Sequence, residues 1–92
     1  MRTAMSTTMR AKLQIGSVFE NHYGPDKTKT SETIRFHGVC KSGGYSEDGL
    51  DEDNTFAKFS PSVDLGITIA NPALWGKFAV GDKFYLDFTP AE

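Results

Sequence analysis

The sequence predicts an all-β protein, a small five-stranded antiparallel barrel or sandwich with one short helical turn before the last strand. Apolar and polar side chains alternate in several short runs, and Gly or Pro separates these runs. The aromatic share of 12% includes seven Phe, which suits a β-rich core. Because 92 residues supply one hydrophobic core, we predict a single domain over residues 9–92, after a flexible arm of residues 1–8.

The first predicted strand covers residues 9–19. Ala11, Leu13 and Ile15 share one of its faces, and basic or amide side chains occupy the other. The alternation slips after Gly16, since the next apolar residue has the opposite parity. This slip predicts a β-bulge at Gly16.

A long hairpin loop over residues 21–31 is predicted next. Gly24-Pro25-Asp26 is turn chemistry, and a run rich in Lys and Thr follows it. Residues 32–41 then alternate again, with Ile34 and Phe36 on one face. They predict a second half-buried strand, antiparallel to the first.

Residues 42–54 predict an exposed, mobile acidic loop, because they hold three glycines and five acids with few apolar side chains. The acids are candidate interaction residues: Glu47, Asp48, Asp51, Glu52 and Asp53. A calcium loop starting at Asp51 would need glycine and glutamate where Phe56 and Ser62 stand. A solvated loop is therefore favoured over a metal site.

Residues 55–69 predict two further strands, which break at Ser60-Pro61. The second of them carries the clearest apolar row in the chain. We expect this row in the core: Val63, Leu65, Ile67 and Ile69.

Asn71-Pro72 predicts the start of a helical turn, because Asn accepts from unpaired amides and Pro in the first position loses no needed donor. The turn covers residues 72–77. Leu74 or Trp75 is expected to form a lid on one end of the fold, and Gly76 to end the turn.

The last strand is predicted over residues 83–88, after a tight turn at Gly81-Asp82 and before Pro90. Its apolar residues Phe84, Leu86 and Phe88 face one way and its polar residues the other. The expected structural centre combines this strand with the preceding one: Leu65, Ile67, Phe84 and Leu86.

The residues indicate neither an enzyme nor a cofactor or metal site. His37 and Cys40 have a ligand-like spacing, yet their opposite parity on a strand directs them to opposite faces, and adding His22 leaves a fourth ligand missing. No nucleophile elbow or glycine-rich phosphate loop occurs. No apolar run is long enough to span a membrane, so no membrane partner is expected.

The net charge of −2 conceals an asymmetry between the two halves of the chain. Residues 1–41 hold seven basic and three acidic side chains, a balance of +4, while residues 42–92 hold three basic and nine acidic ones, a balance of −6. Opposite halves could attract each other between copies, which favours self-association. Strands from both halves could instead interleave within one sheet and cancel the pattern, and this interpretation is preferred.

Single-strand nucleic-acid binding is a competing reading, because aromatic and basic residues on one sheet face could stack bases and meet phosphates. The candidate residues are Arg35, Phe56, Lys58 and Phe59. The net acidic chain and the acidic loop directly before Phe56 oppose a phosphate backbone, so nucleic acid is disfavoured as a partner.

The C-terminal half carries three short motifs: Asn71-Pro72-Ala73, an F-x-x-G-[DE]-x-[FY]-[YF] stretch from Phe78 to Tyr85, and Asp87-Phe88-Thr89-Pro90-Ala91. In these motifs the chain resembles a family of small, mostly uncharacterised tailed-bacteriophage proteins. The opening from Met9 is similar as well, so the resemblance covers roughly residues 9–92. The motifs are structural, and the resemblance implies a phage origin and a β-fold without assigning a functional residue.

A phage origin implies two classes of function. The preferred one is a non-enzymatic virion accessory, a capsid-decorating or head-tail component that contacts a phage structural protein or itself, because a small β domain with an arm can attach by strand addition. The alternative is an early protein that binds single-stranded nucleic acid or inhibits a host nucleic-acid-binding factor. The expected location is the virion or the host cytoplasm.

Overall fold

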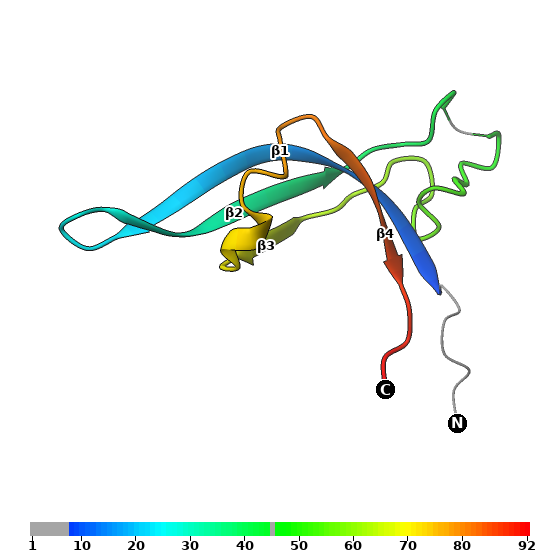
Figure 1. Ribbon diagram of the computed structural model, residues 1–92. Coiled ribbons are helices and arrows are strands. Elements are labelled where there is room, and N and C mark those ends of the chain that lie inside the picture. Colours follow the sequence, from blue (N-terminus) through cyan, green and yellow to red (C-terminus); the bar gives the residue numbers. More distant parts are fainter. Residues whose placement is uncertain (1–7, 45) are drawn as a thin grey trace.

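The computed structural model describes residues 8–44 and 46–92, and these form one open, four-stranded antiparallel sheet (Figure 1). The strand order is β3-β2-β1-β4. The elements are β1 (Met9–Tyr23), β2 (Thr28–Gly38), β3 (Leu65–Ile69), the 3-10 turn η1 (Pro72–Leu74) and β4 (Lys83–Phe88). The all-β prediction is confirmed, but the predicted closed barrel and fifth strand are wrong for the described residues.

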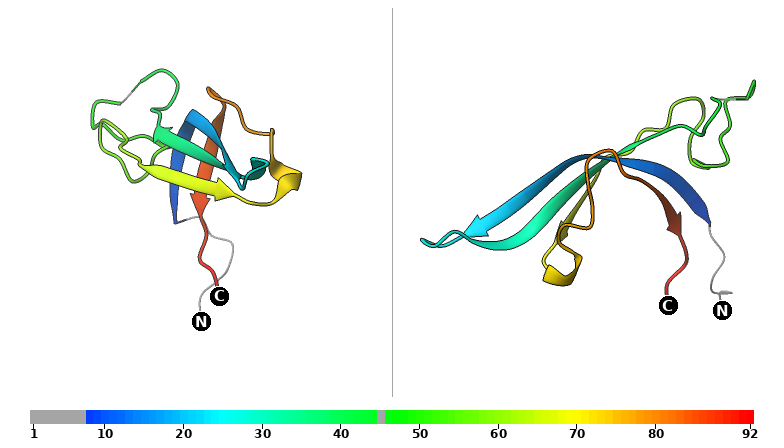
Figure 2. Two further views of the ribbon diagram at one scale, coloured as in Figure 1. Left: turned by 90° about the vertical axis from the view of Figure 1, so that its left-hand side faces the viewer. Right: turned by 45° about the horizontal axis from the view of Figure 1, so that its top comes forward.

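β1 is a central strand of the sheet, because its residues 9–14 pair with β4 and its residues 13–23 pair with β2. The register with β2 shifts between Ile15 and Ser17, so the predicted bulge at Gly16 is confirmed. A bulge bends its strand and increases the local twist. The sheet accordingly forms two sides of an open V, with β2 and β3 on one side and β4 with the start of β1 on the other (Figure 2).

The first hairpin is longer and its turn tighter than predicted. The two strands reach Tyr23 and Thr28, and only four residues, 24–27, connect them. The Lys27 N–H donates to the Gly24 oxygen at 3.0 Å, with Gly24 at φ 86°. The Lys- and Thr-rich run predicted a loop, but Thr is enriched in strands, and the run forms the start of β2 instead.

The segment between β2 and β3 lacks the predicted strand after residue 54. Residues 55–60 form turns, and Phe59 has φ 69°, which is far from an extended conformation. Thr55 instead lies against the edge of β1, where its N–H donates to the Arg10 oxygen at 3.0 Å and its Oγ1 accepts from the Arg10 N–H at 2.9 Å. These two bonds pair the backbone groups of Arg10 at the edge of β1, although residues 55–60 form no strand.

The turn before the last strand starts as predicted and ends earlier. Asn71 caps it, with Oδ1 accepting from the Ala73 N–H at 3.1 Å. The 3-10 turn stops at Leu74, and Gly76 follows at φ 74°. Trp75 is half-buried and its Nε1 donates to the Ile69 oxygen at 2.8 Å, which holds the turn against the end of β3.

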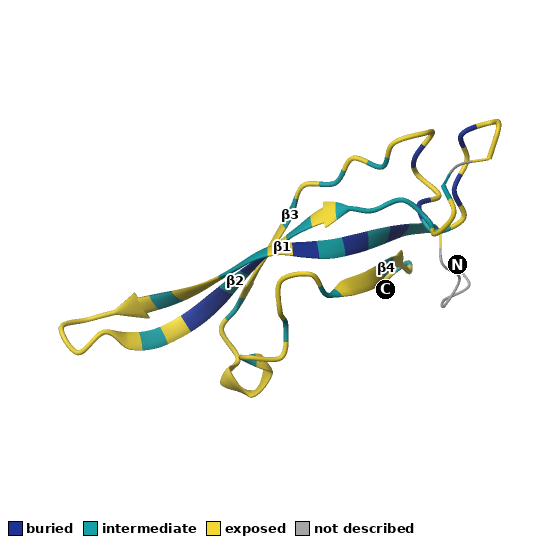
Figure 3. Cartoon of the chain, turned by 90° about the horizontal axis from the view of Figure 1, so that it is seen from above, coloured by how far each residue is buried: buried dark blue, intermediate teal, exposed yellow. Residues whose placement is uncertain are grey.

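The buried core is small. Among the described residues, the buried apolar side chains are Ala11, Leu13, Ile15, Ile34 and Ala57. The expected centre is therefore misplaced, since Ile67 is 43% and Phe84 39% exposed. Figure 3 shows that burial concentrates in the first half of β1 and the middle of β2 and that β3 and β4 remain largely exposed. The physical reason is that no second layer covers the sheet within the described residues.

The predicted N-terminal arm, residues 1–8, lies outside the described residues except for Thr8. The Thr8 N–H donates to the Phe88 oxygen at 2.9 Å, so pairing between β1 and β4 continues to this residue. No helix in the described part of the chain is long and apolar enough to cross a membrane.

Candidate interaction surfaces

The inner side of the V is a continuous apolar surface, which we call the concave face. The register places apolar residues opposite each other on neighbouring strands, as in the pairs Ala11 with Leu86 and Ile34 with Ile67. The face consists of Met9, Ala11, Leu13, Ile15, Val18, Ile34, Phe36, Leu65, Ile67, Ile69, Phe84, Leu86 and Phe88. None of these side chains is charged.

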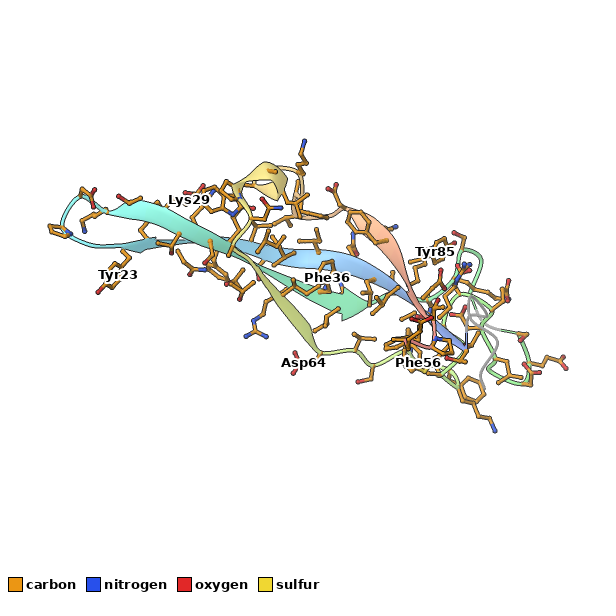
Figure 4. The ribbon with its side chains drawn as sticks, turned by 60° about the horizontal axis from the view of Figure 1, so that its bottom comes forward. Tyr23, Lys29, Phe36, Phe56, Asp64 and Tyr85 are labelled. Atoms are coloured by element: carbon orange, nitrogen blue, oxygen red, sulfur yellow. The ribbon has the colours of Figure 1, made fainter. Side chains whose placement is uncertain are left out.

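Aromatic rings meet across the concave face. Phe36 and Phe84 contact edge to face with their centroids 6.5 Å apart, although β1 lies between their strands. Phe78 adds a tilted contact with Phe84 at 5.6 Å. These contacts cover the centre of the face, where Leu13 and Ile15 are buried. Figure 4 views this side, with Phe36 near the middle of the sheet and Phe56 near the loop end.

The margins of the concave face remain open. Phe88 is 44% exposed, and Phe56, from the loop, is 38% exposed. A hollow of about 200 Å³ lies between Phe56, Met9 and Phe88. Large apolar side chains that line an open hollow are typical of a contact surface for another molecule.

A buried carboxylate bounds the face at the hairpin end. Glu32 is 3% exposed, and its Oε2 accepts from Lys29 Nζ at 2.6 Å and from the Gly76 N–H at 3.2 Å. Lys29 Nζ also lies 4.7 Å from the centroid of the Trp75 ring. The hydrogen bond from Lys29 lowers the pKa of Glu32 against the opposing effect of burial. Glu32 was not among the predicted site residues, although its parity with Ile34 directs it inward.

Asn54 is the most buried polar residue at the opposite end, with no exposed surface. Its Nδ2 donates to the Val39 oxygen at 2.7 Å and to Asp51 Oδ2 at 3.0 Å, and its Oδ1 accepts from the Lys12 N–H at 2.8 Å. One side chain therefore joins the edge of β1 to the segment after β2 and to the acidic loop.

Asp51 corrects the expectation of a uniformly solvated acidic loop. It is 4% exposed and accepts from the backbone N–H groups of Lys41 at 3.0 Å and Asp53 at 2.8 Å. Burial acts to raise the pKa of Asp51, but the hydrogen bond from Asn54 and those from the backbone outweigh it, so the pKa is lowered. Asp51 is a structural residue rather than an exposed contact.

The other predicted acids do not form one patch. Glu47 is exposed, Asp48 accepts from its own turn, and Glu52 pairs with Lys41 Nζ at 3.1 Å. Asp53 lies on the outer side near Lys12 Nζ at 3.7 Å. Within the described residues, His, Cys, Asp and Glu form no group of three or more that could hold a metal ion.

The predicted nucleic-acid cluster is not assembled on one sheet face. Arg35 alternates with Ile34 and so lies on the outer side, where its Nη1 is 3.8 Å from Asp64. Phe56 lines the hollow on the concave side, and Lys58 is exposed in the turns before β3.

Phe59, the fourth residue of that predicted cluster, lies against the acidic loop. Its N–H donates to the Gly49 oxygen at 2.7 Å. A Cβ at Gly49 would come within 2.7 Å of the Phe59 ring, so only glycine fits beneath this ring. The prediction failed because it assumed regular alternation through residues 55–60, which form turns.

A second exposed surface, which the sequence did not indicate, lies on the part of the first hairpin beyond β3 and β4. We call residues 19–31 the hairpin arm. Phe19 is 58% and Tyr23 79% exposed. The sequence analysis missed this surface because it predicted a loop over residues 21–31, whereas β1 continues to Tyr23.

Comparison with protein-family models, with curated proteins and with solved structures finds no match to this chain. Over residues 8–44 and 46–92, the geometry defines an open, single-layer β protein with an uncovered apolar face.

Proposed function

We propose that this protein is a non-enzymatic bacteriophage protein, a virion-associated accessory component of the capsid-decorating or head-tail kind, that acts through protein-protein contacts. The observation that carries the proposal is the open concave face, with Ile67, Phe84 and Phe88 about 40% exposed. Exposed apolar surfaces of this extent are characteristic of protein interfaces. The phage assignment depends on the motif resemblance from Met9 to Ala91.

The chemistry of the concave face supports binding rather than catalysis. Its residues are aliphatic or aromatic and supply no acid, base or nucleophile. The charged groups at its two ends, Glu32 and Asp51, are held by hydrogen bonds from Lys29, Asn54 and backbone N–H groups. They are engaged in maintaining the fold.

The hairpin arm supports attachment to a larger assembly. Two strands that extend beyond their neighbours leave backbone groups at their outer edges, which another chain can pair with. Phe19 and Tyr23 add aromatic surface, which is enriched at interfaces. The arm can therefore contact a virion protein while the concave face makes a separate contact.

Mass spectrometry of purified phage particles tests this role. We expect the protein at high copy number in particles and reduced attachment of the Tyr23→Ala variant, with Tyr85→Ala as a tyrosine control outside the arm. Absence from particles would contradict the virion role. In that case a fluorescence-anisotropy titration with a mixed-sequence oligonucleotide at low salt would test the early nucleic-acid role, in which Phe56→Ala should abolish binding.

A further inference from the structure

We infer that a second copy of this chain covers the concave face, so that two single-layer sheets form one two-layered, two-fold symmetric dimer. This inference deepens the proposed protein-binding role by naming the partner of one of its two surfaces. The sheets of β proteins bury their apolar face against another layer, and within the described residues this chain has only one layer.

The small core indicates that the cover is a permanent partner. Five apolar side chains are buried among the described residues, and two of them are alanines. A domain of this size is only marginally stable when its apolar surface stays in water. A second copy of the chain is always present where the chain is made, and in equal amount. An unrelated partner does not meet this condition.

The charges of the face allow it to meet itself. A two-fold contact brings the same patch of both copies together, so an unpaired charge within the patch would lie near the identical charge of the other copy and be repelled. The apolar residues of the concave face carry no charge, and the charged residues on the same side at its hairpin end, Glu20, Lys29 and Glu32, pair with one another. Asp51 is held within the chain by Asn54. Nothing on the face requires a partner of opposite charge.

The exposed apolar area of the face is a substantial part of what a dimer interface buries. The face follows β1, with β4 beside residues 9–14 and with β2 and then β3 beside the part of β1 that comes after them. Phe84 and Phe88 are 39% and 44% exposed, which leaves on the order of 80 Å² on each ring. With the half-buried residues and Phe56 at the margin, the face reaches several hundred Å², against about 800 Å² per partner in a standard interface.

Analytical ultracentrifugation of the full chain, from about 1 to 100 µM, tests the dimer. The chain has a mass of 10.1 kDa, so we expect twice this mass. Phe88→Lys should weaken the dimer by about a hundredfold or more, because a symmetric interface carries the buried charge twice. Thr68→Lys is the matched control, since Thr68 is exposed and alternates with Ile67, which places it on the outer side of β3.

Thermal unfolding provides a second measurement in case Phe88→Lys does not fold. For a dimer, the melting temperature of the unmodified chain rises with its concentration. A folded monomer of 10.1 kDa at every concentration, or equal weakening by Thr68→Lys and Phe88→Lys, would overturn the inference. A dimer that is absent from phage particles would refute the virion role and leave the dimer intact, so the two failures are distinguishable.

Discussion

Asn54, in a loop rich in acids, has no exposed surface, whereas Phe88, on a strand, is 44% exposed. The difference lies in what each side chain finds around it. Asn54 meets the Lys12 N–H and the Val39 oxygen at a strand edge, two backbone groups that need partners. Phe88 lies on a face that no other layer covers within the described residues. Burial in this protein follows the available partners more closely than residue polarity.

The largest effect should separate two isoleucines that face each other across the sheet. Ile34 is 1% exposed and its partner Ile67 is 43% exposed. We expect Ile34→Ala to lower the free energy of unfolding by about 2–5 kcal/mol, since it leaves a cavity, and Ile67→Ala to cost less than half of that in dilute solution. Urea denaturation of both variants measures this. Equal losses would mean that the margin of the concave face is already covered in the single chain.

Asn54→Ala should come next, because it leaves the Lys12 N–H and the Val39 oxygen buried without their partner. We expect a loss of about 2–4 kcal/mol in the free energy of unfolding. Asn71→Ala is the matched control and should cost about 1 kcal/mol or less, since Asn71 caps only an exposed turn. If Asn54→Ala and Asn71→Ala lower the free energy of unfolding equally in urea, the hydrogen bonds of Asn54 do not hold the acidic loop to β1.

Asp51→Ala tests whether the acidic loop has a structural member. Its carboxylate accepts from the Lys41 N–H, the Asp53 N–H and Asn54. Its loss should cost about 1–3 kcal/mol, while Glu47→Ala, at an exposed position, should stay within about 0.5 kcal/mol. Chemical denaturation at one protein concentration compares them. If neither variant changes the free energy of unfolding, the acidic loop is solvated throughout, as its composition predicts.

The smallest effect is a dependence of stability on pH in the acid range. The pKa values of Glu32 and Asp51 are lowered below their ordinary values of 4.5 and 3.8. The folded chain therefore binds these protons less readily than the unfolded chain, so stability is complete above the ordinary values and declines as pH falls through the lowered ones. Denaturation of the Glu32→Gln variant between pH 7 and 3 should show a shallower decline than the unmodified chain. Parallel curves would show that Glu32 is not held in its charged form.

The sequence alone determined the features that depend on near neighbours. The alternation in residues 9–19 and 32–41, the bulge at Gly16, the Asn71 cap and the strand at residues 83–88 all follow from local conformational preferences. The same alternation identified which side chains share a face. It could not place Phe56, since residues 55–60 form turns and bends.

Only the tertiary structure decided what covers each face and which polar groups are buried. The bond between Lys12 and Asn54 joins residues 42 positions apart, and no local pattern indicates such a contact. Period-two alternation specifies two faces of a strand, but it carries no information about a second layer. For that reason the apolar row at Leu65 and Ile67 was expected in a core, while the folded chain leaves it at the margin of an open face.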